Sequence, residues 1–205
     1  MKLVNLLLAV AVIAAAYSAS AAVIQDTLLI GNPSYGGAGC PAGSASVTLS
    51  PDQKSLSILF DQFTVEAGGM TGKRVDRKAC NIAIPVHVPQ GLSISIIAID
   101  YRGFNSLPSG AQSQFNVEYF FAGGMGPRFS KRFIGSLNED FLVNNTLIAT
   151  GLVWSACGAD VNLRTNTSMM VQSNRYGEQA LSSVDSMDLQ AGVIYQIQWR
   201  KCTGY

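Results

Sequence analysis

The stretch CNIAIPVHVPQGLSISIIAIDYRGF, residues 80–104, decides the fold class because apolar and polar residues alternate on both sides of a short turn. From Cys80 to Val88 the even positions are apolar, whereas the odd positions include Pro85 and His87. Residues 88–91, VPQG, supply the turn, and a second alternating run follows over 92–99. A period of two on both sides of a turn predicts a β-hairpin.

The same alternation recurs along the chain, in the aromatic run 114–121 and again over 193–200. No segment carries a helical stripe, although 138–145, NEDFLVNN, could form one helical turn. About ten strands without helices predict an all-β protein, a single antiparallel β-sandwich of jelly-roll type. The shorter candidate strands are 23–30, 45–50, 55–65, 128–135, 147–156, 161–172 and 180–189.

The first residues predict export. Lys2 precedes an apolar run, and Ala19 and Ala21 give the small-x-small pattern that a signal peptidase reads. We therefore interpret 1–21 as a signal peptide and 22–205 as one secreted domain. No segment is long and apolar enough to predict a transmembrane anchor.

Charge restricts the class of partner. Cleavage of the signal would remove Lys2 from the 14 lysines and arginines, leaving 13 against 13 acidic residues. A near-neutral chain disfavours nucleic acid, or an acidic polymer, as the dominant partner.

The four cysteines, Cys40, Cys80, Cys157 and Cys202, predict two disulfides in an exported protein. Three pairings are possible, and the local pairs Cys40–Cys80 and Cys157–Cys202 are favoured. Zinc is disfavoured because no C-x-x-C pair occurs. The sequence predicts no metal and no cofactor.

His87 is the single histidine, so any Ser–His–Asp or Cys–His arrangement would have to use it. It lies on the polar side of its predicted strand, and no G-x-S-x-G motif accompanies it. We interpret His87 as a residue on the surface of a sheet.

Carboxylates give one further catalytic hypothesis, because glycoside hydrolysis needs only an acidic pair. The candidates in or beside strands are Asp100, Glu118, Asp160, Asp185 and Asp188. Turn residues or ion pairs, such as Asp100 with Arg102, explain the same positions without catalysis. For calcium, the oxygen-rich segments 138–140 and 183–188 are weaker candidates.

The segment IDYRGF supplies the candidate ligand-binding residues Asp100, Tyr101, Arg102 and Phe104. The two aromatic rings could stack on sugars beside the charged pair. A structural corner, with Arg102 bound to Asp100, is the alternative. Other aromatic residues expected in loops or at the end of the chain are Tyr35, Tyr176 and Tyr205.

Two AGGM segments, 67–70 and 122–125, each precede basic residues. They predict exposed hairpin loops or, alternatively, a composite basic patch at one end of the sandwich. The basic residues concerned are Lys73, Arg74, Arg77 and Lys78 after the first segment, and Arg128, Lys131 and Arg132 after the second.

Two sequons begin at Asn144 and Asn166, and both would be glycosylated only in a eukaryotic secretory pathway. Trp154 and Trp199 each precede a cysteine by three residues, which suggests neighbouring strands whose cysteines pair.

Four segments together resemble an uncharacterised family of small secreted proteins of fungi and bacteria. The resemblance implies a secreted β-rich domain with four cysteines, and it implies no catalytic residues. The segments are GCPAGSASVTLSPDQKSLSILFDQFTVEAG (39–68), RKACNIAIPVHVPQGLSISIIAIDYRGF (77–104), WSACG (154–158) and SVDSMDLQ…YQIQWRKC (183–202).

The sequence therefore favours a secreted, non-catalytic β-sandwich that binds an extracellular surface component: a wall polysaccharide, the matrix or a protein. A self-assembling coat or filament subunit is the first alternative, since low charge and many strands favour edge-to-edge association. A glycan hydrolase with a carboxylate pair is the second.

Overall fold

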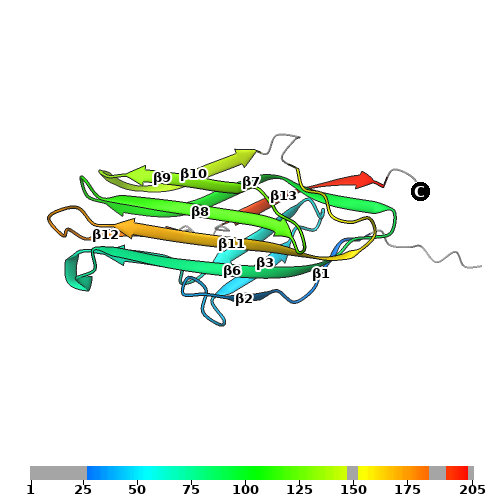
Figure 1. Cartoon of the computed structure of the whole chain (residues 1–205), viewed down its shortest axis with the longest axis horizontal. Coiled ribbons are helices and arrows are strands. Elements are labelled where there is room, and N and C mark those ends of the chain that lie inside the picture. Colours follow the sequence, from blue (N-terminus) through cyan, green and yellow to red (C-terminus); the bar gives the residue numbers. More distant parts are fainter. Residues whose placement is uncertain (1–26, 147–151, 185–192, 203–205) are drawn as a thin grey trace, which may run out of the picture.

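Two antiparallel sheets pack face to face and form an elongated sandwich (Figure 1). The computed structural model describes residues 27–146, 152–184 and 193–202. Within these ranges the single helical element is a 3₁₀ turn, η1 (Gly69–Thr71). The predicted all-β sandwich is confirmed, and the described residues form thirteen strands where about ten were predicted.

The first sheet, sheet A, contains the longest uninterrupted ladder. Its long strands β6, β11 and β8 run side by side along the length of the molecule (Figure 1). Two short strands, β1 and β2, pair with the same outer side of β6. In spatial order the strands are β1 (Leu29–Ile30) and β2 (Ser34–Gly36), β6 (Val75–His87), β11 (Asp160–Gln172), β8 (Gln112–Phe121) and β9 (Arg128–Ile134).

The second sheet, sheet B, is organised around β7 (Leu92–Leu107). One side of β7 pairs with β10, and its other side pairs first with β13 and then with β12. The remaining strands are β3 (Ala45–Leu49), β4 (Ser55–Phe60), β5 (Thr64–Ala67), β10 (Leu137–Thr146), β12 (Ala180–Val184) and β13 (Val193–Lys201).

The core lies between the sheets, where the alternating apolar side chains predicted from 80–88 and 114–121 point inward. Burial of such side chains supplies the main stabilising term, about 25 cal/mol per Å² of apolar surface. Polar contacts also cross the core: the Tyr195 hydroxyl donates to Thr165 Oγ1 at 2.6 Å, and Ser113 Oγ donates to Asn105 Oδ1 at 2.9 Å. Ser182 Oγ donates to the same Asn105 oxygen, so these buried groups are satisfied.

Both disulfides form the favoured local pairs. Cys40 and Cys80 are fully buried, with Cα atoms 5.3 Å apart, and they attach the segment after β2 to β6. Cys157 and Cys202 have Cα atoms 6.0 Å apart. The neighbouring Gly158 and Cys202 donate backbone hydrogen bonds to Leu92 and Gly91, so this disulfide closes over the start of β7.

A β-bulge in β7 changes which residues face the core. Gln196 pairs with Ala98 but Ile197 pairs with Ile96, so Ile97 is an extra residue in the ladder. Ile94 and Ile96 are buried before the bulge, whereas Ile99 and the odd positions as far as Leu107 are buried after it. The regular alternation predicted across 92–99 therefore reverses.

Two expectations for secondary structure need correction. Residues 138–145 form no helical turn, because they belong to β10, which pairs along β7 from Ala98 to Leu107. Strand 180–189 is described only as far as Val184, and of 147–156 the described part contributes one bridge, between Trp154 and Ser95. Trp154 and Trp199 lie on opposite sides of β7 rather than on adjacent strands.

Candidate functional site

The predicted ligand-binding segment lies within β7, not in a loop. Asp100, Arg102 and Phe104 are partly exposed on the outer face of sheet B. Tyr101 points to the other side and is fully buried. The segment IDYRGF therefore does not present its four residues to one surface.

Tyr101 is a core residue, and its interpretation as a loop aromatic is wrong. Its ring stacks on Phe129 with centroids 5.4 Å apart and lies 4.9 Å from the Phe115 ring. Burial raises the pKa of the Tyr101 hydroxyl far above its ordinary value. The side chain joins β7 of sheet B to β8 and β9 of sheet A.

Asp100 is bound by a neighbour on β10 rather than by Arg102. The Asn144 side-chain amide, directly opposite in the ladder, donates to Asp100 Oδ1 at 2.5 Å. Thr146 Oγ1 donates to Asn144 Oδ1 at 2.8 Å. The first sequon residue is thus exposed but hydrogen-bonded, and glycosylation at Asn144 stays a prediction.

His87 lies at the surface of a sheet, as the strand pattern predicted. Its Nδ1 atom is 2.6 Å from Asp160 Oδ1, and both side chains are more than half exposed. Both residues line a shallow hollow formed by β1, the end of β6 and the start of β11. Among the described residues, the hydrogen bond recorded for the His87 side chain is this one to Asp160, and no hydroxyl or thiol nucleophile accompanies it.

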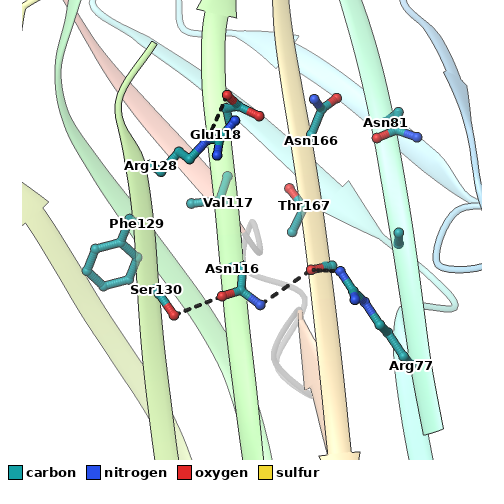
Figure 2. A pocket seen from close by; sticks show the side chains of 12 residues that line it. Arg77, Asn81, Asn116, Val117, Glu118, Arg128, Phe129, Ser130, Asn166 and Thr167 are labelled. Carbon is teal, nitrogen blue, oxygen red and sulfur yellow. Dashed lines mark hydrogen bonds and ion pairs between the residues drawn. The ribbon is translucent and has the colours of Figure 1, made fainter. Parts of the chain in front are cut away.

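The candidate site is a hollow of about 470 Å³ on the outer face of sheet A (Figure 2). Strand register explains why it forms. One transverse row across four strands has short side chains, and the rows before and after it have longer ones. The short row is Ala79, Ser168, Asn116 and Ser130; one flanking row is Arg77, Met170, Gln114 and Arg132, and the other is Asn81, Asn166, Glu118 and Arg128. We call this hollow the trough.

Hydrogen bonds connect the floor of the trough from β9 to β6. Ser130 Oγ donates to Asn116 Oδ1 at 2.8 Å, and the Asn116 amide donates to Ser168 Oγ at 3.5 Å (Figure 2). Arg77 donates to the same Ser168 oxygen at 3.3 Å. Gln114 donates to Asn116 and to Ser130 as well, so the floor is held in one arrangement.

Two amides on the edge of the trough are free. Asn81 and Asn166 lie opposite each other on β6 and β11, and neither side chain forms a hydrogen bond with another described residue (Figure 2). Each amide offers an acceptor oxygen and two N–H donors. The second sequon residue therefore lines the trough, and its glycosylation stays a prediction.

Glu118 and Arg128 close the end of this row. Arg128 Nε donates to Glu118 Oε1 at 3.0 Å, and the arginine is 78% exposed. An exposed pair of this kind contributes about 0–1 kcal/mol, so a ligand could rearrange it at little cost.

The two AGGM loops lie at opposite ends of sheet A, which corrects the expectation of one basic patch built from both loops. Gly69 of the first bonds to Gly177 beyond β11, whereas Ala122 of the second bonds to Asn162 near the start of β11. Two arginines of the predicted sets nevertheless share one row, because β9 returns along the sheet: Arg77 and Arg132.

The predicted carboxylates that the structure describes are not brought together. Asp100 lies on the outer face of sheet B and Glu118 on the outer face of sheet A, so they cannot act on one glycosidic bond. Asp160 shares the outer face of sheet A, but it lies six residues along β11 from Asn166, the partner of Glu118, a distance of about 20 Å. Asp185 and Asp188 fall outside the described residues. No group of three or more His, Cys, Asp or Glu side chains that could hold a metal occurs in the described part of the chain.

The trough could not be seen in the sequence, although the alternation predicted over 80–88 and 114–121 puts Asn81, Asn116 and Glu118 correctly on the outer side of their strands. The signal was the run of small polar side chains at outward positions. Four separate segments contribute, and only strand register shows that they form one row.

The fold and cross-links define a class, an all-β sandwich closed by two disulfides. The chain belongs to the family described as a domain of unknown function, DUF4360, which matches residues 26–202. It is similar to an uncharacterized secreted protein of Arthroderma benhamiae, with 29% identity over 179 residues that cover 87% of this chain and 73% of the relative.

The predicted secretion agrees with the localisation of this fungal relative, and the chain is a secreted protein. In the described residues, no helix is long and apolar enough to cross a membrane. The family resemblance found in the four sequence segments is confirmed.

Proposed function

We propose that this protein is a secreted, non-catalytic binding protein that holds an extracellular polysaccharide in the trough of sheet A. The free amides of Asn81 and Asn166, side by side over a floor of hydroxyl and amide groups, carry the proposal. Sugar hydroxyls both donate and accept hydrogen bonds, and this lining offers both partners.

The shape of the trough also fits a chain molecule. It crosses four strands at about 4.8 Å spacing, so its floor is about 14 Å long. Its preformed hydrogen bonds reduce the ordering cost of binding. A compact small molecule would need a deeper and more apolar pocket.

The self-assembly alternative stays a prediction. The exposed edge strand β9 carries three cations within seven residues, and clustered charge opposes edge-to-edge pairing between copies. These cations are Arg128, Lys131 and Arg132.

The test is binding to a panel of extracellular polysaccharides, with variants matched by strand and face. Asn166→Ala should weaken binding about fivefold because it removes hydrogen bonding worth about 1 kcal/mol. Asn162→Ala, on the same outer face of β11 but outside the trough, should leave binding unchanged.

A second matched pair fills the trough instead of removing a hydrogen bond. Ala79→Ile should block the floor, whereas Ala83→Ile places the same side chain on the same face four residues further along β6. Equal binding by these two variants, or failure of the wild-type protein to bind any polysaccharide of the panel, would refute the proposal. The protein should be made in a host without N-glycosylation, so that no glycan on Asn166 enters the trough.

A further inference from the structure

The outer face of sheet A carries a local excess of positive charge, even though the chain as a whole is near neutral. Its three trough rows and the next row along contain four arginines and one acidic residue, Glu118. The arginines are Arg77, Arg128, Arg132 and Arg164. Average charge therefore understates the attraction of this face for anions.

Three of these arginines keep their charge uncompensated. Arg128 pairs with Glu118, but Arg77 bonds to the neutral Ser168 and Arg132 to the neutral Gln112. Neither Arg77, Arg132 nor Arg164 forms an ion pair with another described residue. An exposed guanidinium without a carboxylate partner is available to bind one from a ligand.

We propose that the polysaccharide is acidic, with carboxylate or sulfate groups that Arg77 and Arg132 bind at the two ends of one wall of the trough. This inference rests on the function proposed above and specifies its ligand class. The two arginines are three strand spacings apart, about 14 Å between backbones, so they would contact charges on different sugar units of one chain.

The lining favours an acidic ligand over a neutral one. No aromatic residue belongs to the three trough rows. Phe120 is half-buried in the next row, opposite Arg164, and Phe129, beside the floor, is stacked on Tyr101 in the core. A neutral sugar bound mainly through its apolar face would need an exposed ring to cover it. This surface offers guanidinium, amide and hydroxyl groups instead.

A second hollow extends the positive surface beyond Arg77. It has a volume of about 290 Å³ between the 68–74 loop and the 173–177 loop, and its lining contains three cations and no carboxylate. These cations are Lys73, Arg74 and Arg175, of which Lys73 is paired with Asp76. A polyanionic chain that leaves the trough past Arg77 would meet this hollow next.

The experiment compares acidic and neutral forms of the same backbone. Binding of the full mature chain, made without N-glycans, is measured to polygalacturonate and its methyl ester, and to dextran sulfate and dextran. We expect at least about tenfold tighter binding to one acidic form than to its neutral counterpart, and loss of this preference as salt screens the charges. The two pairs distinguish carboxylate from sulfate.

Substitutions test whether the trough arginines cause the preference for the acidic form. Arg77→Gln and Arg132→Gln should each reduce binding to the acidic form about tenfold and leave binding to the neutral form unchanged. Arg200→Gln removes the same charge from the outer face of sheet B, where Arg200 lies 4.1 Å from the Trp154 ring, and should not change either. Thermal unfolding of each variant checks the fold.

Each outcome decides something different. Equal binding of acidic and neutral forms, or an acidic preference that survives both trough substitutions, overturns this inference. If Ala79→Ile still abolishes polysaccharide binding in that case, the trough remains the binding site and only the acidic ligand class is lost. No binding to any of the four probes overturns the acidic ligand class, and no binding to the wider panel overturns the proposed function as well.

Discussion

The polar residues on the outer faces of the two sheets differ in whether they already have hydrogen-bond partners within the protein. On sheet B, Asp100 is already bound by Asn144, and Tyr101 of the same segment is turned into the core. On sheet A, Asn81 and Asn166 have no partner among the described residues and border a hollow. A charged residue that the sequence suggests as a ligand contact can already be hydrogen-bonded within the protein, whereas uncharged asparagines on a sheet can remain available to a ligand.

The largest expected effect tests the assignment of Tyr101 to the core. Tyr101→Ala should lower the free energy of unfolding by about 3–5 kcal/mol, as large-to-small changes of buried aromatic residues do. Phe104→Ala, on the outer face of the same strand, should cost about 1 kcal/mol or less. Urea unfolding measures both, and equal costs would show that the face assignment after the bulge is wrong.

A smaller effect separates a buried hydrogen-bond cluster from an exposed one. Asn105→Ala leaves the buried hydroxyls of Ser113 and Ser182 without their acceptor and should cost about 1–3 kcal/mol. Asn116→Ala removes the same amide from the trough floor, where water can replace it, and should cost about 0.5 kcal/mol. The reverse order of stabilities would contradict the assignment of these two clusters.

Acid sensitivity should appear at the basic end of sheet A. Partial burial raises the pKa of the Asp76 carboxyl. Hydrogen bonds from Lys73 Nζ and the Glu66 N–H, together with the lysine charges, lower it by more, so the pKa lies below its ordinary value of 3.8. This stabilisation is therefore complete above pH 3.8 and is lost as pH falls through the native-state pKa.

Asp76→Asn should cost about 1 kcal/mol at neutral pH, and the difference from wild type should shrink in acid. Urea unfolding near neutral pH and below pH 3.8 gives the comparison. A difference that stays constant over this range would rule out the carboxylate as its source.

The smallest effect concerns Glu118 and Arg128 at the end of the trough. A double-mutant cycle with Glu118→Gln and Arg128→Gln should give a coupling of about 0.2–1 kcal/mol that decreases in salt. A coupling of several kcal/mol would assign the pair to stability of the sheet and leave it less available to a ligand.

The strands that alternate without interruption could be predicted, because a sheet with one buried face imposes a period of two. Residues 80–88 and 115–121 show this, and their inward positions are correct. The bulge could not be predicted because it falls in four successive apolar residues, Ile96-Ile97-Ala98-Ile99. The sequence does not show which of these four side chains face the core. Tyr101 was misplaced because the predicted strand ended at residue 99, whereas β7 continues to Leu107.

β10 was missed for a related reason. Its inward residues Phe141 and Val143 flank the exposed but apolar Leu142, so the alternation is broken in sequence. Its partner is the far half of β7, a strand whose length the sequence did not show. The trough depends on register among four segments distant in sequence, which pairing in space establishes and composition does not. The two local disulfides required only the export prediction and sequence proximity.

The most direct test of the comparison follows asparagine side-chain NH₂ resonances by NMR while oligogalacturonate is added to the isotope-labelled protein. Asn81 and Asn166 should shift together with the backbone amides around Ser168, while Asn144 and the amides of β10 should not. Shifts confined to Asn144 and the outer face of sheet B, with an undisturbed trough, would show that the trough is not the binding site.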